Sequence, residues 1–457
     1  MRDIFITAVI CGLIPFILKN PRIGAYTWAW LAMMIPHRLA YGFARTLPFS
    51  QIVGIATLIG FLFSKEKKPF PFSAITAIYL SLIGWMTVTS FFAIDNPDAI
   101  WARWGNIMKI HLFLMLTLML LRGREQIERL IWVITLSIGF YGFKGGLFTI
   151  QTGGGGRVWG PPGGVISGNN ELGVALVMLV PFMFYLFQTN TRRYVRNGML
   201  VLIAATFLGI LGTQSRGALL ALVCMAFFVA LKGKRPVMTS SIISVLLLAA
   251  IAFMPDTWTS RMNTIESYDQ DSSAMSRLYT WKTLWNLAQA RPFVGAGFNA
   301  DIPIIFATYA PLDMGKFDFQ GTVLVAHSIY FQALGEHGFP GLALYLLLGL
   351  MAWRKAGKLA ALTKNDPELS AWVPLLMRMI QASLAGFAVG GAFLSMVHFD
   401  LPYYIVALVV LVEASVQEAR TPRTKSSRSR MPRDPKETSR PIPLPGEGTP
   451  RQRIAQS

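Results

Sequence analysis

The stretch from His327 to Gly341 gathers side chains that could carry out acid–base chemistry. Its sequence is HSIYFQALGEHGFPG, and it places His327, Ser328, Glu336 and His337 directly before a long apolar run. Histidine has an ordinary pKa of about 6.5, so its imidazole can accept a proton from a hydroxyl group near neutral pH. A lone histidine in such a place is more often a hydrogen-bonded residue at a membrane surface, and Glu336 with His337 could be a satisfied pair. The histidine therefore needs partners elsewhere in the chain.

Two arginines are candidates for binding an anion. Arg216 lies in the sequence GTQSRG between two apolar runs, and Arg277 lies in SRLYTW, four residues before Trp281. Arginine binds phosphate oxygens through paired, planar donors. The i, i+4 spacing of Arg277 and Trp281 predicts one turn of an amphipathic helix on the membrane surface. The alternatives are an interfacial anchor for Arg216 and a solvated side chain for Arg277.

Three weaker patterns could also bind phosphate. Residues 153–156 are glycines whose backbone N–H groups could surround a phosphate, and Arg157 follows them, but the Lys-Ser/Thr of a Walker motif is missing. Lys144 lies in an apolar run, near the end that we expect to face outward, and is a second possible anion contact. Asp269 and Asp271 form a DxD pattern, which many glycosyltransferases use to hold a metal and a diphosphate. Two acids at that spacing are common in loops, so we assign no metal site.

Composition predicts the elements that must position these residues. The chain has 457 residues, of which 53% are hydrophobic and 14% are charged, whereas roughly a quarter of the residues of a soluble domain are charged. Apolar runs of about 20 residues are long enough to cross a bilayer. The net charge of +19 is dispersed through short loops and a tail, which argues against nucleic-acid binding, and the two cysteines form no disulfide framework or metal spacing. The sequence therefore predicts an all-α polytopic membrane protein.

The apolar runs predict the membrane crossings. They lie near residues 3–18, 23–36, 50–64, 73–93, 105–121, 128–148, 171–188, 198–213, 217–232, 237–254, 328–353, 376–397 and 401–417. Backbone groups inside lipid must be satisfied internally and no strand alternation is visible, so we expect helices. We interpret the first two runs as one broken crossing, which gives about 12 transmembrane helices. The predicted divisions are N-terminal helices over 1–254, a long outer loop with amphipathic helices over 255–326, C-terminal helices over 327–417, and a disordered basic tail over 418–457.

Loop charges predict the orientation of the chain in the membrane. Basic residues gather at 65–68, 122–124, 192–196, 232–235 and 354–358, which are alternate connections. Cytoplasmic loops carry the excess of Lys and Arg, so we expect these connections and the tail in the cytoplasm. The connections near 95–98, 152–164, 213–216, 255–326 and 398–400 should then face outward. This places His327, Arg216 and Arg277 on the outer side.

Together these patterns resemble a known family. His327-Ser328, nine further residues, and then Gly338 and Gly341 are similar to the His-[Asn/Ser/Gln]-x9-Gly-x-x-Gly motif of bacterial O-antigen ligases. The Ser-Arg-Gly at 215–217 and the run from Arg277 through Trp281, Pro292, Gly295 and Gly297 resemble the core signature of the O-antigen ligase/polymerase superfamily. Residues 36–38 and 157–162 resemble the subgroup of exosortase-associated O-glycosylation ligases. The resemblance covers roughly residues 1–417.

The resemblance implies a function for these residues. Such ligases are GT-C-type glycosyltransferases of the bacterial inner membrane that act in lipopolysaccharide biosynthesis. They transfer a preassembled glycan from undecaprenyl diphosphate to a sugar hydroxyl of lipid A–core on the periplasmic face, with inversion and without metal, nucleotide or other cofactor. His327 is then the catalytic base, and Arg216 and Arg277 bind the donor diphosphate. The supporting residues are Ser328, Glu336, His337, Arg157, Lys144, Trp281, Gly338 and Gly341.

Other functions remain compatible with the sequence. An O-antigen polymerase shares the signature but uses a second lipid-linked glycan as the acceptor, and a protein O-oligosaccharyltransferase uses the same donor with a serine or threonine. A transporter of lipid-linked sugars is a different class with a similar number of spans. Transporters usually place ionisable residues and broken helices near the middle of the membrane, whereas here the ionisable residues gather at one face.

Overall fold

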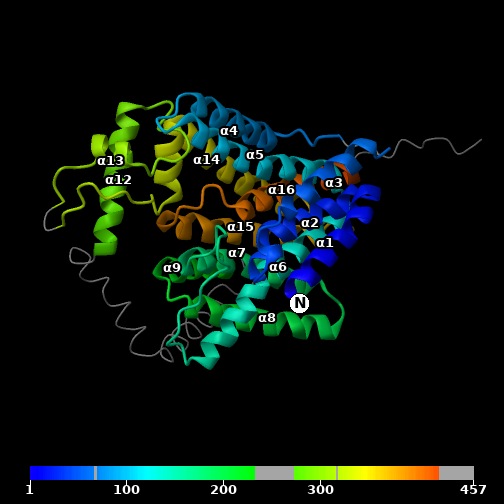
Figure 1. Ribbon diagram of the computed structural model, residues 1–457. Helices are drawn as coiled ribbons and strands as arrows, with labels where there is room; N and C mark the ends of the chain where they lie inside the picture. The colour runs from blue at the N-terminus through cyan, green and yellow to red at the C-terminus, as the bar shows by residue number, and fades with distance from the viewer. Residues whose placement is uncertain (66–68, 232–271, 315–316, 421–457) are drawn as a thin grey trace, which may run out of the picture. The chain divides into compact units, whose positions relative to one another are not determined.

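The computed structural model describes residues 1–65, 69–231, 272–314 and 317–420, and its regular structure over these residues is helical (Figure 1). Met1–Gln417 form one compact unit, and a second unit runs from Glu418 to Ser457. The predicted run 237–254, the DxD of Asp269 and Asp271, and nearly all of the predicted tail lie outside the described residues. The all-helical prediction is confirmed for the part of the chain that the structure describes.

Every predicted apolar run within the described residues forms a helix. The helices are α1 (Arg2–Lys19), α2 (Pro21–Met34), α3 (Phe49–Phe63), α4 (Ala74–Phe91), α5 (Pro97–Leu120), α6 (Gly123–Gln151), α7 (Asn169–Thr189), α8 (Arg193–Gly212), α9 (Arg216–Leu231), α12 (Ser272–Ala290), α13 (Pro303–Tyr309), α14 (Ile329–Leu362), α15 (Val373–Gly390) and α16 (Asp400–Arg420), with short 3-10 turns η1 (Pro36–Leu39), η2 (Phe43–Arg45) and η3 (Gly391–Phe393). Among the described helices, seven are long and apolar enough to cross a membrane: α4, α6, α7, α8, α14, α16 and the combined stretch Val373–Phe393. Two shorter apolar helices are α3 and α9. This makes the chain a multi-pass membrane protein.

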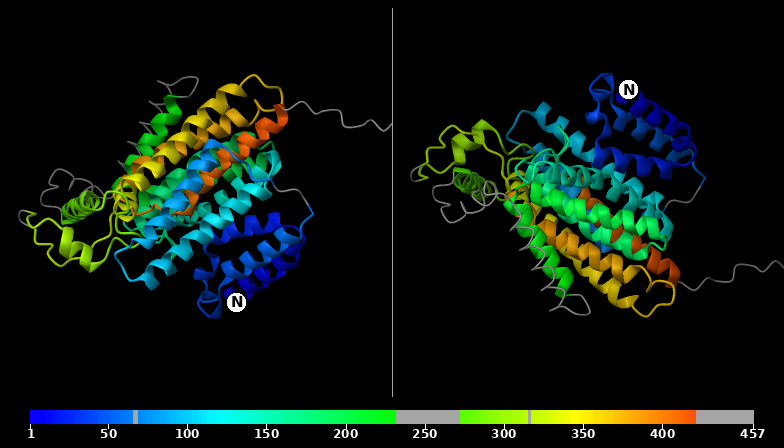
Figure 2. Two further views of the ribbon diagram at one scale, coloured as in Figure 1. Left: turned by 90° about the horizontal axis from the view of Figure 1, so that it is seen from above. Right: turned by 90° about the horizontal axis from the view of Figure 1, so that it is seen from below.

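The first two helices form a hairpin rather than a single broken helix. Asn20 joins them in an extended conformation and caps α2 by accepting a hydrogen bond from the backbone N–H of Arg22. At the other end of the hairpin, the Asp3 carboxylate accepts hydrogen bonds from the N–H groups of Gly42 and Ala44, just after α2 and η1. Both helices pack against α3, and the three helices lie together at one flank (Figure 2).

The core of the bundle surrounds α16. In the most apolar stretch of α16, 89% of the residues are buried, and the helix runs through the middle of the molecule's first unit (Figure 1). A helix enclosed on all sides needs an almost continuous apolar sequence, which the run IVALVVLV supplies. Its buried acid Glu413 accepts a hydrogen bond from Lys355 of α14 at 2.5 Å.

Connections that the charge pattern assigns to the same side of the membrane meet at the same end of the bundle. On the outward-assigned end, Ile94 N–H donates to the Ala296 carbonyl at 2.9 Å, and Val158 N–H donates to the Gly212 carbonyl at 2.9 Å. On the basic end, Arg122 donates to the Pro69 carbonyl at 2.5 Å. The helices therefore traverse the unit from one end to the other, as the alternation of loop charges predicts.

The long outer stretch contains a helix that packs on the bundle. α12 has 19 residues and contacts α14, and α13 lies against α12 (Figures 1 and 2). Trp281 stacks on Phe331 of α14 with ring centroids 5.1 Å apart, and its indole N–H donates to the Ala326 carbonyl at 2.8 Å. Arg277 and Trp281 therefore lie on a helix in the outer stretch, as their i, i+4 spacing predicts, and this helix packs on the bundle. A full helix forms because its apolar face is buried against α14.

Candidate functional site

The backbone at His327 is held in an unusual conformation. Its φ is +43°, in the left-handed region that non-glycine residues rarely adopt, and such strain costs on the order of 1–3 kcal/mol. Ser395 holds this conformation by accepting a hydrogen bond from the His327 N–H at 2.8 Å. The next residue, Ser328, is the N-cap of α14 and accepts a hydrogen bond from the N–H of Phe331. Ser328 thus has a structural explanation, while the strain at His327 points to a functional requirement.

The surroundings of His327 favour a neutral imidazole. Burial lowers its pKa from the ordinary value, and the positive charge of Arg277 lowers it further. The Nδ1 atom is buried and makes no hydrogen bond within the described residues. A neutral imidazole can accept a proton near pH 7. The side chain is therefore suited to act as a general base.

Arg277 lies on α12 between two titratable side chains. Its charge acts on His327, at the start of α14, and on Glu171, in the first turn of α7. Arg277 is therefore within electrostatic range of both side chains. Its influence on His327 is what the family motif leads us to expect, and Glu171 is a further neighbour that the sequence pattern did not suggest.

Arg216 is anchored at the same end of the bundle. It is the first residue of α9, and the loop before it is held by Asn169, whose side-chain amide donates to the Thr213 carbonyl at 2.8 Å. A Cβ built on Gly217 would lie 3.6 Å from the Cβ of Phe393 in η3. Two residues after Phe393 comes Ser395, the hydrogen-bond partner of His327. The short segment 391–395 therefore connects the Arg216 loop to the His327 loop.

The glycine-rich loop lies against the Arg216 loop. Gln214 donates through its amide to the Gly154 carbonyl at 3.3 Å, and Arg157 lies over the ring of Trp159. Arg157 is thus placed near Arg216 through the loop that carries it. Lys144, in contrast, is exposed on α6, and no contact joins it to the other candidate residues within the described part of the chain. Its role as an anion contact stays a prediction.

Gly338 breaks α14 so that a loop can dock. Its φ is +69°, which interrupts the helix, and the carbonyls of Gly335 and Glu336 accept hydrogen bonds from the N–H groups of Ala296 and Gly297, both at 2.8 Å. A Cβ on Gly338 would lie 2.4 Å from the Phe293 carbonyl oxygen. Gly338 of the motif therefore has a structural role. Its lack of a side chain leaves room for the 292–297 loop to pack against α14.

Glu336 and His337 belong to a buried polar network. The carboxylate of Glu336 accepts hydrogen bonds from Gln332 at one oxygen (3.0 Å) and pairs with His398 Nε2 at the other (2.7 Å). His337 Nδ1 pairs with the hydroxyl of Thr89 at 2.7 Å, and its Nε2 lies 3.7 Å from the Glu336 carboxylate. These contacts explain both residues as structural supports. The loop charges place His398 in an outward connection, and no sequence pattern assigned it a role. Its pairing with Glu336 could have been predicted only from the rule that a buried carboxylate needs a partner.

The same cluster has the residue types of a metal site. Candidate ligand atoms of Glu336, His337 and His398 all lie within 4.8 Å of one another. Two histidines and a carboxylate suit several transition metals. A metal ion would, however, have to replace the hydrogen bond between Glu336 and His398. The observed contacts are those of a hydrogen-bonded network, and we derive no reaction step from a metal here.

A polar cavity opens beside the His327 loop. Its volume is about 150 Å³, and its polar lining consists of Arg103, Asn299, Asp301, Gln332, Glu336 and Ser395. Asn299 has a φ of +63°. Of the four described non-glycine residues with positive φ, Gln214, Asn299 and His327 lie around this region, and Ile35 is the fourth. Strained backbone is thus concentrated where the candidate residues gather.

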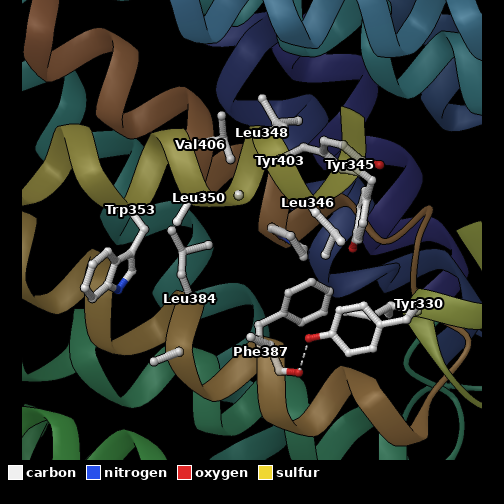
Figure 3. A pocket seen from close by; sticks show the side chains of 15 residues that line it. Tyr330, Tyr345, Leu346, Leu348, Leu350, Trp353, Leu384, Phe387, Tyr403 and Val406 are labelled. Atoms are coloured by element: carbon white, nitrogen blue, oxygen red, sulfur yellow. Dashed lines mark hydrogen bonds between the residues drawn. The ribbon is translucent and has the colours of Figure 1, made fainter. Parts of the chain in front are cut away.

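An apolar groove lies on the other side of the start of α14. It has a volume of about 260 Å³ and is bounded by α14, α15 and α16. Figure 3 shows Tyr330 at one end, donating a hydrogen bond to the Ala388 carbonyl at 2.6 Å, and Trp353 at the other. Leucine, alanine and aromatic side chains line the space between them. Tyr330 is only three residues from His327, so the groove leads to the candidate base.

Comparison with known proteins identifies part of the chain. Residues 199–346 match the family model described as O-antigen ligase, and residues 1–191 match a family of unknown function (DUF5935). A search of curated proteins found no match. The O-antigen ligase match contains Arg216, Arg277 and His327, together with Gly338 and Gly341. It confirms the resemblance to O-antigen ligases over this segment.

Proposed function

This chain is an O-antigen ligase-type membrane protein, and we propose that it catalyses one specific reaction. The enzyme transfers a preassembled glycan from undecaprenyl diphosphate to a sugar hydroxyl of lipid A–core, on the periplasmic face of the inner membrane. We further propose a GT-C-type arrangement with about 12 crossings and a cytoplasmic C-terminus. The observation that carries this proposal is the strained, neutral His327 beside Arg277, next to the end of an apolar groove.

The leaving group would be bound by arginine. Arg277 and Arg216 lie at the same end of the bundle as His327 and can donate paired hydrogen bonds to diphosphate oxygens. When the bond between the anomeric carbon and the phosphate oxygen breaks, negative charge grows on that oxygen. Preorganised donors that stabilise developing charge often supply the largest part of catalysis. Undecaprenyl diphosphate then leaves with the electron pair of the broken bond.

His327 would activate the acceptor. Its neutral imidazole takes the proton of the attacking hydroxyl while the hydroxyl oxygen bonds to the anomeric carbon. Attack opposite to the leaving diphosphate inverts the configuration at that carbon. A positioned base contributes roughly 10²–10⁴-fold to a rate. No nucleotide is needed to drive this reaction, because the diphosphate is itself the leaving group, and the resemblance to O-antigen ligases implies that the reaction is metal-independent.

The apolar groove suits the lipid part of the donor. A polyprenyl chain is a flexible hydrocarbon, and the groove is lined by apolar side chains of three helices (Figure 3). Because Tyr330 lies three residues after His327, a chain in the groove would carry its diphosphate toward the arginines. This supports a lipid-linked donor over a soluble nucleotide sugar.

The direct test is a reconstituted transfer assay with His327→Ala. Purified protein, undecaprenyl-diphosphate glycan and lipid A–core are combined in the presence of a chelator, and the glycosylated product is measured. The wild-type protein should form product, while His327→Ala should lose at least about 100-fold in rate with unchanged membrane insertion. Transfer by His327→Ala at the wild-type rate would contradict the assignment. Product from donor alone would identify a polymerase.

A further inference from the structure

The polar cavity lies next to the proposed base. Ala326 and Ser395 are part of its wall, and they are respectively the residue before His327 and the partner of its backbone N–H. A single water needs roughly 10–15 Å³ of such space, so a cavity of about 150 Å³ has room for a ligand of several heavy atoms. A molecule bound here would lie next to the backbone of the His327 loop.

The charges in the cavity select against ions. Both oxygens of Glu336 are already engaged, by Gln332 and His398, which leaves the Asp301 carboxylate to face the cavity. One such carboxylate opposite Arg103 does not offer the many oxygen ligands that Mg²⁺ or Ca²⁺ needs. An anion would meet the carboxylates of Asp301 and Glu336 against the single positive charge of Arg103.

The surroundings of Asp301 disfavour its negative charge, so the pKa of this carboxyl is raised. Partial burial raises this pKa, and the carboxylates of Glu336 and Asp95 act in the same direction, while Arg103 opposes them. A neutral ligand with many hydroxyls avoids this repulsion. Each hydroxyl can donate to a carboxylate and accept from an arginine or an amide.

Helix geometry separates the cavity from the proposed diphosphate site. Leu284 lines the cavity and lies seven residues after Arg277 on α12. Seven residues are two helical turns, so the two side chains share a face and their backbones are about 10 Å apart. Trp281 lies between them and donates to the Ala326 carbonyl. Arg277 and the cavity thus lie about two helical turns apart along α12, and the Trp281 contact to Ala326 places the His327 loop against the helix between them.

We propose that the polar cavity binds the acceptor sugar, so that Asp301, Asn299 and Arg103 orient the ring whose hydroxyl is deprotonated by His327. The proposal rests on the proposed transfer function. It assigns Asp301 and Asn299 as specificity-determining residues for the acceptor, whereas the arginines of the diphosphate site act on the donor.

Two variants remove the contacts of the cavity without filling it. Asp301→Asn keeps the shape and removes the charge. Asn299→Gly removes the amide, including the hydrogen bond that its Nδ2 donates to the Asp95 carboxylate at 3.3 Å, while allowing the positive φ at this position. Asp318→Asn makes the same chemical change at an exposed carboxylate that does not line the cavity and is the matched control. Each protein is assayed with varied lipid A–core and with varied donor.

We expect both cavity variants to change the KM for the acceptor and not the KM for the donor. The KM for lipid A–core should rise about tenfold in Asp301→Asn and in Asn299→Gly, which corresponds to the loss of one hydrogen bond to a bound ligand. The KM for the donor should stay as in the wild type, and Asp318→Asn should change neither. A rise in the donor KM would overturn the proposal by assigning the cavity to the donor glycan. Unchanged acceptor KM values would also overturn it.

A binding measurement separates this proposal from the proposed function. Core oligosaccharide released from lipid A is added to the detergent-purified protein, and thermal stability is measured. It should stabilise the wild type and Asp318→Asn but not Asp301→Asn. If wild-type protein transfers no glycan to lipid A–core, the proposed function fails. This binding measurement alone then shows whether the cavity binds the core sugar. Equal stabilisation of all three proteins, or of none, would then overturn the acceptor site.

Discussion

At the scale of single residues, backbone strain distinguishes His327 from the polar residues that follow it in the motif. A residue with φ of +43° would be glycine or asparagine if only the turn mattered. The neighbouring Ser328 caps a helix, and Glu336 and His337 have partners in a buried network. His327 keeps its Nδ1 without a hydrogen bond in the described residues, as His337 and His398 do with one ring nitrogen each. What distinguishes His327 is therefore its backbone, and we infer that this conformation serves the reach of the side chain.

The influence of Arg277 on His327 gives a prediction for pH dependence. Only neutral His327 can act as a base, so kcat/KM should fall as the pH drops through its pKa. That pKa is lowered by burial and by the charge of Arg277, so the wild-type acid limb should lie below the ordinary value of about 6.5. Arg277→Gln removes the repulsion and should move the limb to higher pH, in addition to slowing the reaction. The full pH profile of kcat/KM measures both effects.

A suitable control for this profile is Arg129→Gln. Arg129 is exposed on α6 and pairs with Glu125 four residues earlier, at the basic end of the helix. Its substitution removes the same charge far from His327, so the acid limb should stay in place. An unshifted limb in Arg277→Gln would mean that the titrating group is not His327 or that the two residues are not neighbours in the working enzyme.

At the scale of elements, the break in α14 is required for the docking of the 292–297 loop. Gly338→Ala would force a side chain into a left-handed conformation and place its Cβ 2.4 Å from the Phe293 carbonyl oxygen. We expect a loss of stability of about 2 kcal/mol or more, together with a large loss of transfer. Gly84→Ala in α4 is the control, because nothing lies within 4 Å of the added methyl group. Thermal unfolding in detergent compares the two, and equal stability would show that the break does not hold the loop.

The apolar groove gives a prediction about the length of the lipid donor. Ala385→Phe would fill part of the groove, so a long polyprenyl chain should bind less well, while a donor with a short prenyl chain should be affected little. The KM values for the two donors are compared, with Ala361→Phe as a control on an exposed part of the same bundle. Equal effects on both donors would argue that the chain lies elsewhere.

Sequence reasoning located the helices well and the site only in part. Apolar runs fix helix positions because each run must be buried in lipid or protein, so the predicted run 171–188 became α7 at Asn169–Thr189. The break at Gly338 and the pairing of Glu336 with His398 depend on contacts between distant segments, which local patterns do not encode. Asp301 and Asn299 look like ordinary loop residues until the 292–297 loop docks on α14. The number of crossings and the roles of Arg216, Arg277 and His327 stay predictions.

At the scale of the whole molecule, the proposed reaction requires one end of the bundle to face the periplasm. The connections at that end include residues 92–96 and 291–299, joined by the hydrogen bond of Ile94 to Ala296. The opposite end carries Arg22, Arg122 and Arg124, which contact Leu120, Pro69 and Trp372. Because cytoplasmic loops carry the excess of basic residues, this end should face the cytoplasm.

Cysteine labelling tests this orientation directly. After the native Cys11 and Cys224 are replaced by serine, single cysteines are introduced at the exposed positions Asn96, near the proposed site, and Arg192, at the basic end. A membrane-impermeant maleimide added to spheroplasts should label Asn96→Cys and leave Arg192→Cys unlabelled until the membrane is permeabilised. The reverse pattern would place His327 and both arginines in the cytoplasm, where a glycan already on the periplasmic face could not reach them. Labelling of both positions in sealed spheroplasts would mean that the helices between them do not cross the bilayer as the loop charges predict.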